Sequence, residues 1–330
     1  MRPSILAIAL TLGVMLPPPA TAQTAGVAIT EWLVPWPNSR PRDPYVAPDG
    51  AVWFVGQRED YAARFDPDTE TFTRFDLAPG TGPHNLIVDG DGMVWYAGNR
   101  AAHIGKLDPA SGAIVEYPMP DPAAGDPHTL VFDGQGHIWF TVQQGNFLGR
   151  LTMTNGDVEL VPVPTPHARP YGIVVDDAGR PWATLFGSNM IATVDPTAMT
   201  LRQIETPNAD SRIRRIVLTS DGAVWYVDYQ QGALGRYDPT TGDISEWPAP
   251  SAARSKPYGM AVDDQDRIWF VETGPSPNRF VVFDTESETF MAESAIPSGG
   301  GSVRHMMYHH ATQSVWFGTD TNMLGRASLP

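Results

Sequence analysis

Seven large polar side chains recur at one position of an internal repeat, each 11 residues before a tryptophan. They are Arg42, His84, His128, Tyr171, Arg214, Tyr258 and His305. If the fold brings them together, their imidazoles, guanidiniums and phenols form an electropositive, hydrogen-bonding surface. Such a surface suits an anionic, phenolic or lactone-like small molecule better than a cation, and we predict a ligand site there. Tyr171 and Tyr258 have an equally good structural explanation, because a Pro-Tyr-Gly motif also fixes a turn.

Three carboxylates follow the tryptophans closely and are candidates for metal binding or proton transfer. Asp228 and Glu272 lie three residues after the tryptophan of their repeat, and Asp320 lies four residues after its own. Side chains alternate between the two faces of a strand. Carboxylates three and four residues after a tryptophan therefore point to opposite faces unless a bulge intervenes. Next to His305, such a carboxylate would hold a hard cation or support a proton acceptor. The alternative is that these are surface carboxylates on connecting loops.

The tryptophans define the elements that must position these groups. They are separated by 42, 44, 43, 43, 44 and 47 residues and stand at Trp53, Trp95, Trp139, Trp182, Trp225, Trp269 and Trp316. A repeat of this length holds four short strands, and such sheets bury their faces by packing radially as blades. We therefore predict an all-β, seven-bladed propeller of four-stranded blades. The tryptophan is expected between blades, on the inner strand that lines the channel.

The two ends of the chain complement each other. The seventh repeat stops at residues 324–330 without an outer strand. Residues 29–36 (Ile-Thr-Glu-Trp-Leu-Val-Pro-Trp) closely match the outer-strand segment 244–248 (Ile-Ser-Glu-Trp-Pro). We predict that this N-terminal strand pairs with the last blade and closes the ring.

The start of the chain predicts export. Residues 1–22 combine a basic start, a short apolar core and an Ala-Thr-Ala cleavage pattern, as in a secretory signal peptide. We expect residues 23–330 to be a single propeller domain, periplasmic or secreted, monomeric and not inserted in a membrane. The chain has no cysteine, which excludes disulfides. A formal net charge of −15 argues against nucleic acid as a partner.

The repeats resemble those of the virginiamycin B lyase (streptogramin lyase) family over essentially the whole mature chain. Four recurring motifs carry the resemblance: Pro-Tyr/His-Gly-Ile, Asp-Gly-x-Val/Ile-Trp-Phe, Ile/Leu-Gly-Arg/Lys-Leu and Ile-x-Glu-Tyr/Trp-Pro-x-Pro. The resemblance implies a seven-bladed propeller. Characterised members of that family confer antibiotic resistance by opening the cyclic depsipeptide of type B streptogramins through elimination at an ester. They use Mg²⁺, histidines and a glutamate at the channel mouth.

The resemblance also implies roles for individual residues. The histidine of the family's last blade corresponds to His305, and the acid after the last Trp-Phe corresponds to Asp320, an aspartate in place of glutamate. The acid after the penultimate Trp-Phe corresponds to Glu272, whereas the penultimate histidine is replaced by Tyr258. The resemblance thus implies catalysis by His305, Glu272 and Asp320, with Mg²⁺ on the two carboxylates. The remaining six polar residues of the ring, Tyr258 included, would bind the substrate.

Two other classes stay open. A non-catalytic periplasmic propeller would use the same polar residues to hold a small ligand or a protein, and it would bind without forming a product. A calcium-dependent lactonase of the gluconolactonase or regucalcin type shares the propeller plan. Such an enzyme needs several Asp, Glu and Asn side chains that point inward around one cation. The seven ring positions contain none of these residue types. We rank the lyase-like enzyme first, the binding propeller second and the lactonase third.

Overall fold

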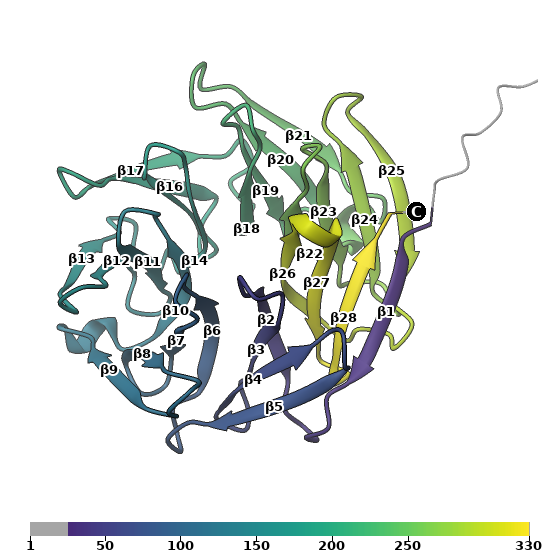
Figure 1. Cartoon of the computed structure of the whole chain (residues 1–330). Helices are drawn as coiled ribbons and strands as arrows, with labels where there is room; N and C mark the ends of the chain where they lie inside the picture. The colour runs from purple at the N-terminus through teal and green to yellow at the C-terminus, as the bar shows by residue number, and fades with distance from the viewer. Residues whose placement is uncertain (1–25, 330) are drawn as a thin grey trace, which may run out of the picture.

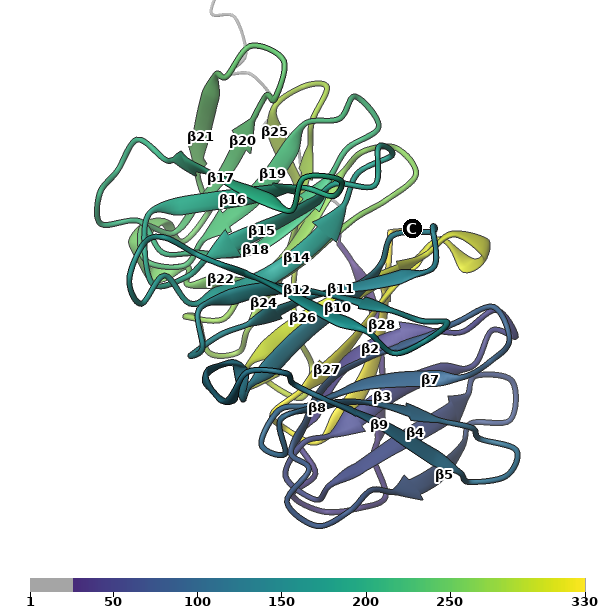
Figure 2. The same cartoon turned by 90° about the vertical axis from the view of Figure 1, so that its left-hand side faces the viewer.

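The chain forms a closed ring of seven four-stranded antiparallel sheets around a central channel (Figure 1). The computed structural model describes residues 26–329, and the predicted signal peptide lies outside this range. Figure 2, turned by 90°, shows the twisted sheets packed side by side as blades. The prediction of an all-β, seven-bladed propeller is confirmed. Each blade starts at the channel and proceeds outward, and we number the blades 1 to 7 by their first strands.

Four strands at successive distances from the axis make up each blade. The inner strands are β2 (Pro41–Val46), β6 (Pro83–Val88), β10 (Pro127–Phe132), β14 (Pro170–Val175), β18 (Ile213–Leu218), β22 (Pro257–Val262) and β26 (Val303–His309). The second strands are β3 (Val52–Gly56), β7 (Val94–Gly98), β11 (His137–Val142), β15 (Pro181–Leu185), β19 (Val224–Asp228), β23 (Ile268–Glu272) and β27 (Ser314–Thr319).

The outer half of each blade is more exposed. The third strands are β4 (Tyr61–Asp66), β8 (His103–Leu107), β12 (Phe147–Thr152), β16 (Met190–Asp195), β20 (Ala233–Tyr237), β24 (Arg279–Asp284) and β28 (Met323–Ser328). The outer strands are β5 (Thr71–Asp76), β9 (Ile114–Pro118), β13 (Val158–Pro162), β17 (Thr200–Glu205), β21 (Ile244–Pro248), β25 (Thr289–Ala295) and β1 (Ala28–Leu33). Three single 3-10 turns complete the described elements: η1 (Pro122–Ala124), η2 (Ala252–Arg254) and η3 (His310–Thr312). No helix within residues 26–329 is long and apolar enough to cross a membrane.

The tryptophans lie on the second strand of each blade, so the prediction that they stand on the inner strand was wrong. Their packing between blades is confirmed: Trp269 of blade 6, for example, shares a buried cluster with Val315 and Phe317 of blade 7. Several indoles also donate to the turn that precedes their strand, as Trp95 Nε1 does to Asp89 at 2.8 Å and Trp269 Nε1 to Asp263 at 2.8 Å. The recurring aspartate six residues before the tryptophan therefore fixes the indole between the blades.

The ring closes as predicted, with strand β1 completing the last blade. β1 pairs antiparallel with β28 from Ala28 opposite Ser328 to Leu33 opposite Met323, and the two strands lie side by side in Figure 1. On β1, Trp32 stacks on Trp316 of the same blade, with ring centroids 5.5 Å apart. Both chain ends therefore stabilise one sheet.

Candidate functional site

The seven predicted polar residues all lie at one end of the channel. Each is the second residue of its inner strand, except His305, which is the third residue of β26. We call the opening at which the inner strands begin the N-terminal mouth and the opening at which they end the C-terminal mouth. All seven inner strands begin at the same mouth and run along the channel. Residues at one position of the repeat therefore form a ring around the axis. The structure thus brings these side chains together.

Their aromatic and imidazole rings contact one another around the channel. The His84 and His128 ring centroids are 3.6 Å apart, and those of His128 and Tyr171 are 4.2 Å apart. The phenols of Tyr171 and Tyr258 share a hydrogen bond across the axis. Arg214 lies over the Tyr258 ring, with its guanidinium carbon 3.6 Å from the ring centroid. The ring of polar residues is therefore a packed cluster.

A second layer of polar side chains lies one residue further along the inner strands. Asp43 is buried and pairs with Arg42 at 3.0 Å and with Arg215 at 3.6 Å. Asn85 donates to Asp43 at 3.2 Å, and Arg215 Nη1 donates to Thr129 at 3.4 Å. This layer was not predicted from the sequence, although these residues also share one repeat position, ten residues before the tryptophan.

A repeated irregularity explains why two consecutive residues reach the channel. In all seven blades the register between the inner and second strands shifts just after the inner strand begins, as between Arg42 and Tyr45 or Ile213 and Arg215. A bulge breaks the strict alternation of faces and redirects the side chains at its position. Asp43 also has a left-handed backbone with φ of 51°, a conformation held mostly where the surroundings enforce it.

The channel is rich in positive charge, and its histidines are neutral. Arg42 and Arg215 pair with a single carboxylate, Asp43, whereas Arg214 faces the phenols of Tyr171 and Tyr258. Burial alone would raise the pKa of Asp43, but Arg42 and Arg215 outweigh it and hold that pKa below its usual value. Burial, and then Arg215, lowers the pKa of His305 to about 4. At neutral pH its imidazole is therefore an uncharged proton acceptor.

The other two histidines of the ring behave similarly. Burial, followed by the nearby Arg42, lowers the pKa of both His84 and His128 well below the usual value. Nδ1 of His84 and Nε2 of His128 have no hydrogen-bond partner. The two rings, which contact each other at a tilt of 38°, are therefore neutral groups with free nitrogen atoms inside the channel.

The two channel tyrosines differ in acidity. Burial alone would raise the pKa of Tyr171, but Arg214, Arg215 and Arg42 outweigh it and lower that pKa to about 8. Burial, together with the charge of Tyr171, raises the pKa of Tyr258 to about 12. The pair therefore loses its first proton at Tyr171, close to neutral pH.

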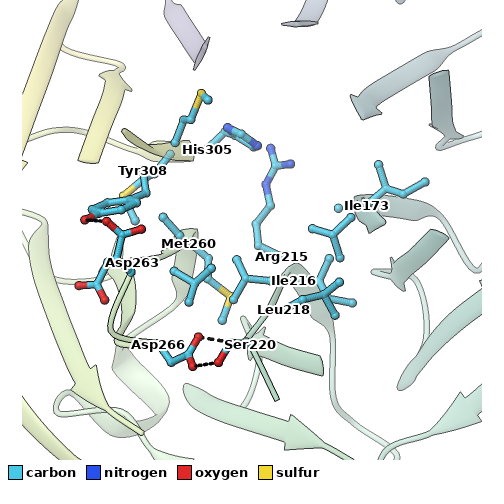
Figure 3. Close-up of a pocket in the computed structure, with 18 of the residues that line it drawn as sticks. Ile173, Arg215, Ile216, Leu218, Ser220, Met260, Asp263, Asp266, His305 and Tyr308 are labelled. Atoms are coloured by element: carbon cyan, nitrogen blue, oxygen red, sulfur yellow. Dashed lines mark hydrogen bonds between the residues drawn. The ribbon is translucent and has the colours of Figure 1, made fainter. Parts of the chain in front are cut away.

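A pocket of about 510 Å³ opens at the C-terminal mouth and ends at His305 and Arg215. Figure 3 shows these two side chains pointing toward each other at one end of the pocket. The walls are mostly apolar and come from four neighbouring inner strands: Ile173, Ile216, Leu218, Met260 and Met306. The opening carries polar side chains from the following turns, including Ser220, Asp264, Asp266 and His310. His305 Nδ1 has no hydrogen-bond partner, so it is free to act on a bound molecule.

The carboxylates predicted to join His305 have other partners. Glu272 is fully buried and accepts hydrogen bonds from the backbone and side chain of Ser251 at 2.7 and 2.8 Å and from Arg279 at 2.7 Å. Asp320 accepts from both terminal nitrogens of Arg304 and lies 3.5 Å from Arg40. Glu272 is the last residue of the second strand β23, and Asp320 directly follows the second strand β27. Both therefore lie one strand further from the axis than predicted.

Asp228, the third carboxylate, has a structural role. It accepts from the backbone nitrogens of Arg212, Gln230 and Gln231 at 2.9 to 3.1 Å, and so it joins the loop before β18 to the turn after β19. The structure does not bring it to the ring of polar residues.

The residues proposed for Mg²⁺ do not fit this ion. A magnesium site uses free carboxylate oxygens arranged around one point, whereas both oxygens of Glu272 and of Asp320 already accept hydrogen bonds from protein groups. Within residues 26–329 no group of three or more His, Asp and Glu side chains is arranged to hold a metal. We therefore assign no chemical step to a metal.

Fold and site together define a closed seven-bladed propeller with a cation-rich channel and a neutral histidine at the base of an apolar pocket. The chain belongs to the Virginiamycin B lyase family, whose model matches residues 21–209 and 177–329. No curated protein matches the sequence significantly.

Solved structures of similar architecture include lyases and other propellers. A streptogramin B lyase structure is 26% identical, with a TM-score of 0.83 over 92% of this chain and 98% of the other. A catalytically inactive histidine-to-alanine variant of virginiamycin B lyase from Staphylococcus aureus, solved with quinupristin, is 23% identical, with a TM-score of 0.84 over 92% of this chain and 100% of the other. The WD40 propeller domain of Doa1 is only 12% identical, with a TM-score of 0.74 over 93% of this chain and 97% of the other, so its likeness concerns the fold alone.

Proposed function

We propose that this propeller is a carbon–oxygen lyase that opens a cyclic ester or depsipeptide by elimination, with His305 as the proton acceptor. One observation carries the proposal: a neutral imidazole with an unpartnered Nδ1 lies beside the Arg215 guanidinium at the base of an apolar pocket. Membership of the Virginiamycin B lyase family supports it, and the resemblance of the repeats implies that His305 corresponds to the histidine of the family's last-blade motif.

The chemistry follows from these two groups. His305 removes the proton from the carbon next to a substrate carbonyl, and the electron pair of that C–H bond forms a carbon–carbon double bond. The ester C–O bond at the neighbouring carbon breaks, and the ester oxygen leaves with its electron pair as a carboxylate. The ring opens with no change in mass, and no water is consumed. Arg215 stabilises the negative charge that develops on the carbonyl oxygen, the role that fixed donors have in oxyanion sites.

The pocket suggests what kind of substrate is accepted. Its walls of isoleucine, leucine, valine and methionine bind apolar side chains, and methionine adapts to irregular shapes. The relative solved with quinupristin makes a type B streptogramin the first substrate to test. Export to the periplasm and a monomeric state stay predictions.

The test is an assay of residues 23–330 with a type B streptogramin, with products followed by mass spectrometry. We expect a linear product of unchanged mass from the wild type and none from His305→Ala. His309→Ala is the control, because His309 lies on the same strand but bonds to Thr312 outside the channel. A hydrolysed product heavier by one water, or full activity of His305→Ala, contradicts the proposal.

A binding propeller without chemistry is the second candidate. It is favoured by the replacement of the family's penultimate histidine by Tyr258, whose phenol bonds to Tyr171, and by the pairing of Asp320 with Arg304. Calorimetric binding of the streptogramin with no product over long incubation would support this candidate. The calcium-dependent lactonase gains no support, since the described residues contain no cluster of carboxylates suited to a cation.

A further inference from the structure

Arg214 is a cation without a counterion. Its guanidinium carbon lies 3.6 Å from the ring centroid of Tyr258, 4.4 Å from that of Tyr229 and 4.6 Å from that of Phe186. No carboxylate among residues 26–329 lies within 4.0 Å of it, and its Nε has no hydrogen-bond partner. Aromatic rings contact the faces of a guanidinium, whereas its N–H donors lie in the plane. This environment therefore stabilises the charge and leaves in-plane donors for a ligand.

Three more basic residues stand at the N-terminal mouth in the blade of Arg214 and in the two blades beside it. Arg169, Arg212 and Lys256 lie at the same repeat position, 13 residues before a tryptophan, in the adjacent blades 4, 5 and 6. None of them has a carboxylate within 4.0 Å in the described part of the chain. Lys256 lies over the Tyr229 ring at 5.5 Å and bonds only to Gln230. Four cations thus converge on one mouth of a protein whose net charge is −15.

The backbone at these positions is strained. Arg169 and Lys256 have φ values of 53° and 46°, in the left-handed region that favours glycine, and Gly82 holds the same repeat position in blade 2 with φ of 54°. Residues with side chains adopt this conformation at a cost, and such strain concentrates at binding sites. Glycine would adopt this conformation at a lower cost. The basic side chains at these positions are therefore not explained by the turn alone.

The C-terminal mouth provides a contrast. Its arginines have counterions in the turns that follow the inner strands: Arg236 pairs with Asp221 at 3.0 Å, and Arg267 pairs with Asp263 at 2.7 Å. At the N-terminal mouth Arg40, which holds the same repeat position in blade 1, also has a counterion, Asp320 at 3.5 Å. Arg169, Arg212 and Arg214 have no such partner among residues 26–329, so blades 4 and 5 hold arginines without counterions at this mouth.

We propose that the N-terminal mouth at blades 4 to 6 binds an oxyanion, a carboxylate or a phosphate, carried on a planar apolar ring. The in-plane donors of Arg214 bind the anion, and Arg169, Arg212 and Lys256 add attraction around it. Phe186 and Tyr229, both half-buried, offer ring faces to the apolar part. This site does not depend on the elimination proposal, because His305 acts in a pocket that opens at the other mouth.

The test is calorimetric titration of the wild type with benzoate, phenyl phosphate and inorganic phosphate at low salt. We expect benzoate or phenyl phosphate to bind, with an affinity that falls as salt is added. Which of the two binds more tightly distinguishes a carboxylate from a phosphate ligand. Arg214→Met removes the charge and keeps an apolar stem, and we expect it to weaken binding about tenfold or more. Arg236→Met at the opposite mouth is the matched control and should bind as the wild type does.

Further variants show whether a loss of binding comes from the charges or from misfolding, and whether this site is separate from the elimination site. Arg169→Ser combined with Lys256→Ser changes only residues of the mouth, and it should weaken binding even if Arg214→Met folds poorly. Phe186→Ala should weaken the aromatic anions but not inorganic phosphate. His305→Ala, which tests the elimination, should bind the probes normally. Failure of all three anions to bind, or unchanged binding by both charge-removing variants, would overturn this proposal.

Discussion

Nε of Arg215 donates a 2.8 Å hydrogen bond to the backbone carbonyl of Arg304, the residue immediately before His305. This contact joins blade 5 to blade 7 past the inner strand of blade 6. It fixes the guanidinium beside the imidazole, while the 3.6 Å approach to Asp43 balances part of its charge. The two groups of the proposed elimination are therefore positioned by one backbone contact and not by the carboxylates that the sequence suggested.

Arg215→Lys should keep the charge next to Asp43 but lose the fork that reaches Arg304 and Thr129. If the elimination takes place, we expect its kcat to fall about tenfold to hundredfold, because a lysine cannot reproduce an oriented guanidinium. Steady-state kinetics on the streptogramin, with Arg236→Lys as the control, measures this. Equal kcat values for the wild type and Arg215→Lys would remove Arg215 from the mechanism.

Ring closure depends on the aromatic face of β1. Trp32 stacks on Trp316 and its ring centroid lies 5.1 Å from that of Phe65 of blade 1, so Trp32→Ala removes packing within the closing blade and between it and blade 1. We expect a loss of about 3–5 kcal/mol in the free energy of unfolding, measured by denaturant titration. Leu33→Ala on the same strand should cost little, because Leu33 is 66% exposed. Equal effects of the two substitutions would show that β1 does not close the ring through this face.

Glu272 is expected to stabilise the fold and not to bind a metal. Glu272→Ala leaves Arg279 and the Ser251 turn without their acceptor, and we expect it to cost about 1–3 kcal/mol in unfolding free energy. Glu293→Ala is the matched control, since Glu293 pairs with the same arginine at 3.3 Å but is partly exposed. A titration of both variants with Mg²⁺ completes the test. A metal-dependent stabilisation that disappears only in Glu272→Ala would restore the magnesium prediction.

Much of the architecture could be predicted from the sequence because it is periodic. The spacing of the tryptophans indicates seven blades, and the match between residues 29–36 and 244–248 predicts the closing strand. The same alignment identifies the ring from Arg42 to His305, because the inner strands share one orientation around the axis. Each of these features is a weak signal in a single copy, and it can be recognised because it occurs in several repeats.

The details of the site depend on departures from that periodicity. The tryptophan strand proved to be the second and not the inner strand, which displaced Glu272 from the channel. The bulge that turns both Arg42 and Asp43 inward leaves no clear mark in the residue types. The partners of Asp320 and Glu272 come from other loops, at distances along the chain that no local pattern specifies. Tertiary contacts therefore decided which carboxylates are free.

The acidity of Tyr171 provides a spectroscopic test of the channel. With its pKa lowered to about 8 from a usual value of 10, Tyr171 should ionise before the other tyrosines, and tyrosinate absorbance should show one early step that Tyr171→Phe removes. Tyr117→Phe, on the outer strand β9, should keep the step. Arg214→Met should shift it to higher pH, because Arg214 makes the largest charge contribution to the lowered pKa.

The same shift determines how pH affects stability. Between pH 8 and 10 the folded protein has released the Tyr171 proton and the unfolded chain has not, so the unfolded state binds more protons and stability rises with pH. This contribution is complete above pH 10 and is lost as the pH falls through 8. The difference in unfolding free energy between the wild type and Tyr171→Phe should therefore shift in favour of the wild type across this interval. A difference that is independent of pH would mean that the three arginines do not hold a phenolate in the channel.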